Sequence, residues 1–225
     1  ITLAKFLAIS GIILPMLPHK NLIPDINLTP YSIWLATVVV SGISYLSYLL
    51  KRYVFHESGV LVSGIIGGLY SSTATISVLA RKSRKASEQE ANEYVAAMLL
   101  AVSMMFLRFM ILILIFSREI FTSIYPYLLI MSVVAAVVAW FIHSRHRRSK
   151  DMTDESEDED SSNPLEFKVA LIFATLFVVF TVLTHYTLVY AGTGGLNLLS
   201  FVSGLSDITP FILNLLQNTG SVAVL

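Results

Sequence analysis

Seven apolar stretches constrain this chain more than any other feature of its sequence. A helix needs about 20 apolar residues to cross the roughly 30 Å hydrocarbon layer of a bilayer, and these stretches approach or reach that length. Backbone polar groups must bond internally in lipid, so the stretches predict helices rather than open strands. We expect an all-α, polytopic transmembrane helical bundle in the lipid bilayer, whose segments are Ile1–Leu17, Tyr31–Val54, Val60–Ala80, Tyr94–Phe116, Ile120–Ile142, Leu165–Tyr190 and Leu196–Leu216.

The composition excludes several other classes of protein. Of the 225 residues, 55% are hydrophobic and 13% are charged, whereas a soluble domain is about 45–50% apolar and about 25% charged. The absence of cysteine excludes a disulfide scaffold and a cysteine-ligated metal site. No hydrolytic triad, phosphate-binding loop or dinucleotide motif is visible, so we do not expect an enzyme. The basic clusters flank membrane segments, which argues against a nucleic-acid partner.

A charged stretch divides the chain. Residues 143–150 are mainly basic, and Asp151–Asp160 holds seven carboxylates in ten residues. This composition is typical of a solvated linker, although a metal-collecting or regulatory patch is the alternative. We therefore expect a first membrane half at 1–142, a charged cytoplasmic linker at 143–164, and a second membrane half at 165–225 that is truncated at its C-terminus.

The orientation follows from Lys and Arg in the short loops. Basic residues favour a cytoplasmic position for the loops 81–93 and 143–164, and the N-terminus is then outside, in the inner membrane of a prokaryote. This assignment leaves three basic residues on the outer side of the membrane, Lys51, Arg52 and Arg118. The glycine-rich segments 60–80 and 196–216 are either full crossings or broken, re-entrant segments, and re-entry would change the count.

The sequence also contains an internal repeat. At a constant offset of 136, Gly68–Thr73 aligns with Gly204–Thr209, and Gly64 aligns with Ser200. A full apolar helix precedes each motif, at 31–54 and at 167–190, so the first repeat unit covers 31–80. Such a two-fold repeat resembles the halves of transporters, in parallel orientation if every segment crosses the membrane.

Asp207 is the only acidic residue well inside an apolar segment. A charge there costs on the order of 3 kcal/mol, which makes it a functional-site hypothesis by default. Pro210 would free backbone carbonyls nearby. Carboxylate, hydroxyl and carbonyl oxygens suit a hard metal cation or a proton. We expect Asp207 to be the metal ligand or proton carrier, within an ion-binding set of Ser71, Ser72, Thr73, Thr75, Ser206, Asp207 and Thr209.

Packing offers a simpler explanation for part of this pattern. Small residues let helices approach closely in lipid, and hydroxyls can bond back to the carbonyls of their own helix. We assign a helix-packing or hinge role to Gly64, Gly67, Gly68, Gly204 and Pro210.

Arg108 is the second charge inside an apolar segment. It either snorkels or hydrogen-bonds to helix ends, or it pairs with Asp207 as an internal counter-charge.

Three motifs carry a family resemblance: Trp34–Tyr45, Gly64–Thr75 and Phe106–Phe109. Together they resemble the uncharacterised membrane domain that follows MgtC/SapB domains in bacterial and archaeal proteins. The resemblance implies a missing N-terminal MgtC/SapB-type domain and a link to magnesium homeostasis. The family's second motif tends to read Gly-Leu-x-Asp-x-Asp, and this chain has Thr209 in place of the second acid.

These observations predict a transporter or channel for a small inorganic cation, with divalent ions such as magnesium among the candidates. The cofactor expectation is limited to a bound metal cation of unknown identity, and homo-oligomerisation is left open. The alternative is a non-transporting membrane module that regulates partner membrane proteins in ion homeostasis.

Overall fold

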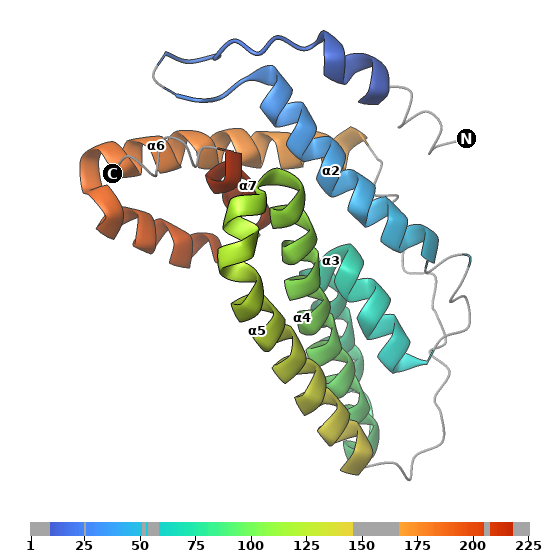
Figure 1. Ribbon diagram of the computed structural model, residues 1–225. Coiled ribbons are helices and arrows are strands. Elements are labelled where there is room, and N and C mark those ends of the chain that lie inside the picture. The colour runs from blue at the N-terminus through green and yellow to red at the C-terminus, as the bar shows by residue number, and fades with distance from the viewer. Residues whose placement is uncertain are drawn as a thin grey trace. The chain divides into compact units, whose positions relative to one another are not determined.

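The computed structural model describes residues 10–24, 26–50, 53, 59–145, 167–204 and 208–217. These residues are mostly helical, and an isolated bridge joins Ile23 and Ile26. The predicted all-α class is confirmed. Residues 10–16 form a short helix, and the later helices are α2 (Pro30–Leu49), α3 (Val60–Ser83), α4 (Glu88–Phe116), α5 (Arg118–Arg145), α6 (Phe167–Gly204) and α7 (Ile208–Gln217) (Figure 1).

Five of these helices are long and apolar enough to cross a membrane: Pro30–Leu49, Val60–Ser83, Glu90–Phe116, Arg118–Ser144 and Ala170–Gly204. Length and composition do not show how each helix is bent. The contacts form two compact units, one combining Ile1–Ser41 with Pro164–Leu225 and the other comprising Gly42–Asn163.

In the second unit, α4 and α5 form an antiparallel pair (Figure 1). Ser87 and Glu90 form a capping box at the start of α4, which satisfies amides that a helix start otherwise leaves open. Ser117 alone separates the two helices, and its amide donates to the Ile113 carbonyl over 2.8 Å. Deep in the pair, the hydroxyls of Ser103 and Ser132 lie 2.9 Å apart and each donates to the other's carbonyl. These bonds satisfy polar groups that lipid cannot.

Helix α3 folds back on itself at Ser71, whose φ of −157° and ψ of 101° are not helical. Val60 and Leu79, near opposite ends of α3, belong to the same buried cluster. A continuous helix would hold them about 28 Å apart at 1.5 Å per residue. The two limbs, residues 60–70 and 72–83, therefore form a hairpin against α4. Each limb is about 17 Å long, roughly half of the hydrocarbon thickness.

Helix α6 breaks at Gly192, where φ is 58° and ψ is −153°. This region of backbone conformation favours glycine because a Cβ atom would clash there. The break lies close to residue 190, where the sequence predicts the end of an apolar segment, and Figure 1 shows the chain reversing between the two parts of α6. Residues 193–204 and α7 are each too short to cross the membrane alone.

Within the first unit, α7 packs against the earlier part of α6. The Phe180 and Phe211 rings lie 5.9 Å apart in an edge-on arrangement. Asn214, which is fully buried, donates to the Thr184 hydroxyl over 2.8 Å and to the Phe180 carbonyl over 3.3 Å. This polar contact fixes α7 in register with residues 180–184 of α6.

Candidate functional site

The hairpin of α3 is held to α4 by very close backbone contacts. A Cβ atom added to Gly68 would lie 2.5 Å from the Cα of Ala101, and one added to Gly64 would collide with the carbonyl of Ala97. Only hydrogen fits at these two positions, so the glycines bring limb 60–70 directly onto α4. The hairpin itself is equally tight, since a Cβ atom on Gly67 would lie 2.5 Å from the Thr75 hydroxyl oxygen.

The turn of the hairpin gathers the hydroxyl run that the sequence singles out. The Ser71 hydroxyl accepts from the Ala74 amide over 3.3 Å, as an N-cap residue does at the start of a helix. The hydroxyls of Ser72, Thr73 and Thr75 have no hydrogen-bond partner within the part of the chain that the structure describes. Thr73 is exposed, and the other two are half-buried. We call residues Ser71–Thr75 the hairpin tip.

These three hydroxyls differ in their hydrogen bonding from other hydroxyls on the described helices. Helical Ser and Thr side chains commonly bond back to the carbonyl four residues earlier. The following side chains do so over 2.8 Å: Thr37, Ser77, Thr175, Thr181 and Ser200. For Ser72, Thr73 and Thr75, the residue four positions earlier lies on the other limb or at the break itself. The break therefore leaves these three hydroxyls available to a ligand.

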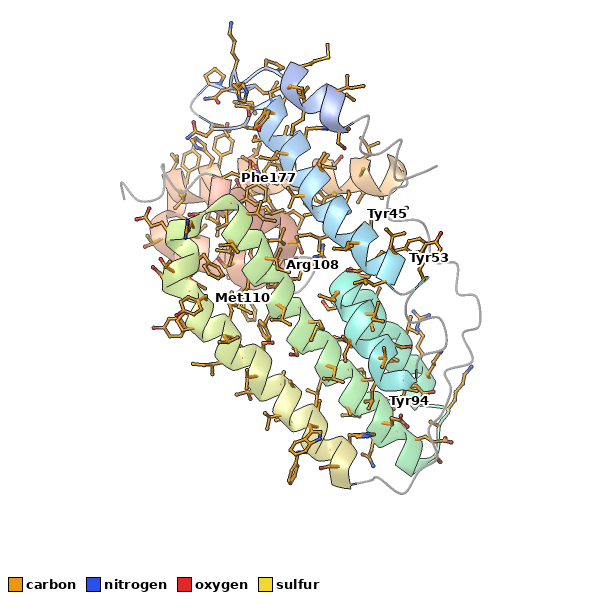
Figure 2. The ribbon with its side chains drawn as sticks, turned by 45° about the vertical axis from the view of Figure 1, so that its right-hand side comes forward. Tyr45, Tyr53, Tyr94, Arg108, Met110 and Phe177 are labelled. Atoms are coloured by element: carbon orange, nitrogen blue, oxygen red, sulfur yellow. The ribbon has the colours of Figure 1, made fainter. Side chains whose placement is uncertain are left out.

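Arg108, on α4, reaches the same break. Its Nη1 atom donates to the Tyr70 carbonyl over 2.9 Å, and Tyr70 is the last residue of limb 60–70. The carbonyl end of a helix carries partial negative charge, which stabilises a cation. Arg108 thus makes the contact with a helix end that the sequence allowed, and Figure 2 labels its side chain on α4.

The second polar segment is only partly described. Thr209 and Pro210 are buried near the start of α7, whereas Gly204 is exposed at the end of α6. Ser206 and Asp207 lie outside the described residues, so the roles predicted for them, including the pairing of Asp207 with Arg108, stay predictions. The hairpin tip and Thr209 belong to different units.

Among the described residues, no group of three His, Asp or Glu side chains is placed to hold a metal ion. Sequence reasoning missed two polar features of the bundle. One is the Ser103–Ser132 pair, and the other is Asn214. The sequence carried a signal for Asn214, namely an amide side chain inside an apolar segment. A buried amide needs a hydrogen-bond partner in lipid.

Long apolar helices, with buried polar pairs between them and a hairpin too short to cross, define a helical integral membrane protein. The chain belongs to the family described as a domain of unknown function (DUF4010), whose model matches residues 38–224. An uncharacterized protein from Aquifex aeolicus (strain VF5) is 26% identical over 168 residues, which cover 73% of this chain and 71% of that protein. No solved structure matches the chain.

Proposed function

We propose that this protein is a transporter or channel for a small inorganic cation, with divalent ions such as magnesium among the candidates. The observation that carries the proposal is the hairpin tip, where Ser72, Thr73 and Thr75 present hydroxyls without partners in the described chain. Each limb spans roughly half of the hydrocarbon layer, so the tip lies near the membrane midplane. Broken helices at the midplane are a common way to build ion sites in transporters.

The repeat extends the proposal to the second polar segment. At the offset of 136, Ser71 aligns with Asp207. Helix α6 ends at Gly204, which aligns with Gly68, and α7 begins at Ile208, which aligns with Ser72. From the alignment of the two motifs, we propose a second re-entrant unit at this position. In this proposal Asp207 supplies a negative charge for cation binding, and hydroxyl oxygens supply neutral ligands.

A re-entrant α3 also changes the topology that we propose. The chain returns to the side from which it entered, so Lys51 and Arg52 join the basic loops 81–93 and 143–164 on the cytoplasmic side. The predicted position of the N-terminus outside depended on a full crossing by α3. In the re-entrant topology, the loop 18–29 lies outside instead. Only α2, α4 and α5 cross between equivalent points of the repeat. An odd number of crossings makes the two units inverted rather than parallel.

The test is ion flux in proteoliposomes, with Na⁺, K⁺, H⁺, Mg²⁺ and Mn²⁺ assayed in turn. We expect Thr73→Val, combined with Ser72→Ala, to reduce the flux of the transported ion by at least about tenfold, as loss of ligands at an ion site would. Thr175→Val is the matched control, because that exposed threonine bonds back to its own helix over 2.8 Å. Flux that is equal in the two variants would contradict the site.

A non-transporting module that regulates membrane partners is the second candidate. Helix α5 favours it, because it is the least buried of the five candidate spans. Trp140 is 71% exposed and Tyr127 is 69% exposed, and such a surface can accept a partner helix as well as lipid. An MgtC/SapB-type domain preceding this chain would fit that role. The absence of flux for every ion of the panel would leave this candidate standing.

A further inference from the structure

The packing of limb 60–70 on α4 follows a simple register. Gly64 meets Ala97 and Gly68 meets Ala101, so the limb and α4 run parallel with small residues in contact. One turn beyond Ala101, the α4 sequence changes to large side chains, beginning with Met104 and Met105. A continuous α3 could not follow α4 at the same close distance past this point, because the contact tolerates no Cβ atom at either glycine. The limb ends here, at Tyr70.

Two hydrogen bonds satisfy the backbone at the break. In a continuous helix, the Tyr70 carbonyl would accept from the Ala74 amide, four residues later. In the structure, Arg108 donates to this carbonyl over 2.9 Å, and the Ser71 hydroxyl accepts from this amide over 3.3 Å. The carbonyl's partner comes from α4, whereas the amide's partner comes from the hairpin itself.

We propose that Arg108 is a positioning residue that holds the hairpin tip in its non-helical conformation at Ser71. It anchors the end of limb 60–70 to α4, and the first hydroxyls of limb 72–83 follow directly after that anchor. Because those hydroxyls form the ion site suggested above, the inference rests on the proposed function. Arginine suits the task, since a charged donor makes a strong bond to a carbonyl and the carbonyl end of the limb stabilises the charge.

Spin labels can test this role without any measurement of transport. The chain has no cysteine, so engineered cysteines are the only labelling sites. One pair, Thr73→Cys with Ser123→Cys, reports the position of the tip relative to α5, and both native residues are exposed. The control pair, Val95→Cys with Val137→Cys, reports α4 against α5 and uses two further exposed side chains. Distance distributions are recorded by pulsed electron resonance on the whole chain in lipid nanodiscs.

We expect Arg108→Leu to widen the tip distribution by about twofold or more, as local release of a segment does, while the control pair stays narrow. Arg108→Lys, which keeps a charged donor, is expected to restore a narrow tip distribution. A tip distribution that is unchanged in Arg108→Leu would overturn the proposal. If that variant does not fold, Arg108→Gln is judged by the same criteria. Broadening of both pairs in the neutral variants would also overturn it, because Arg108 would then support the whole bundle.

The outcome is separable from that of the proposed function. A tip that depends on Arg108 in a protein without ion flux would keep the positioning role and reject transport. Ion flux, together with a tip whose distance distribution does not depend on Arg108, would keep transport and reject the positioning role.

Discussion

Val60 and Leu79 lie near opposite ends of one helix and yet pack in the same buried cluster, together with Tyr94 and Ala97 of α4. This relationship makes α3 a hairpin whose two limbs pack against α4. In the re-entrant topology proposed above, the hydroxyl-rich turn would lie near the membrane midplane, where transport proteins place polar groups.

The fold-back of α3 predicts a specific cross-link. Val60→Cys and Leu79→Cys, introduced together into the cysteine-free chain, should be joined by a short bifunctional thiol reagent, because the cluster holds both residues. Peptide mass spectrometry after proteolysis measures the product. A control pair, Val60→Cys with Thr73→Cys, joins one end of the hairpin to its tip and should not react, since a limb is about 17 Å long.

The contact between Gly68 and Ala101 predicts a packing defect. Gly68→Ala places a methyl group 2.5 Å from the Cα of Ala101, and we expect it to destabilise the protein by about 1–3 kcal/mol through overpacking. Thermal unfolding in detergent measures the effect. Gly42→Ala is the matched control, because a Cβ atom there meets nothing within 4 Å. It should be neutral or stabilising by up to about 1 kcal/mol, since alanine is the better helix former. Equal stability losses in the two variants would contradict the close contact.

The Asn214–Thr184 bond predicts energetic coupling between α6 and α7. The buried Asn214 amide donates a hydrogen bond to the Thr184 hydroxyl over 2.8 Å. A double-mutant cycle with Asn214→Ala and Thr184→Val should give a coupling of about 0.6–2 kcal/mol, the range for hydrogen bonds between helices in membranes. Replacing Thr184→Val by Thr175→Val, whose native hydroxyl bonds within its own helix, should give no coupling to Asn214. Coupling in that control cycle would show that the first value does not report the bond.

The role proposed for Asp207 predicts a loss of transport without a loss of folding. Asp207→Asn keeps the size of the side chain and removes its charge, so ion-dependent flux in proteoliposomes should disappear. Thermal unfolding should be unchanged or slightly more favourable to the folded state, because an uncompensated charge in lipid is costly. Flux that persists at the level of the unmodified protein would remove Asp207 from the site.

Several features could be predicted from the sequence because they depend on local chemistry. The apolar runs predicted helices in a membrane, and α4 and α5 formed as a pair close to residues 94–116 and 120–142. The end of the segment near residue 190 also matched, because Gly192 can adopt the positive φ that the reversal requires. The density of glycine and hydroxyl residues in Gly64–Thr75 is likewise a signal that the sequence itself carries.

The sequence by itself predicted a bilayer protein, because several apolar runs of about twenty residues match the hydrocarbon thickness. It could not determine whether residues 60–83 form one straight helix or a hairpin, since the apolar pattern is compatible with both. Tertiary contacts decided that question: the backbone of α4 at Ala97 and Ala101 accepts only glycine, and Arg108 bonds the carbonyl where the limb ends. A break in a helix is stable only where other groups, of the same segment or of a neighbouring element, supply the partners that the helix gives up.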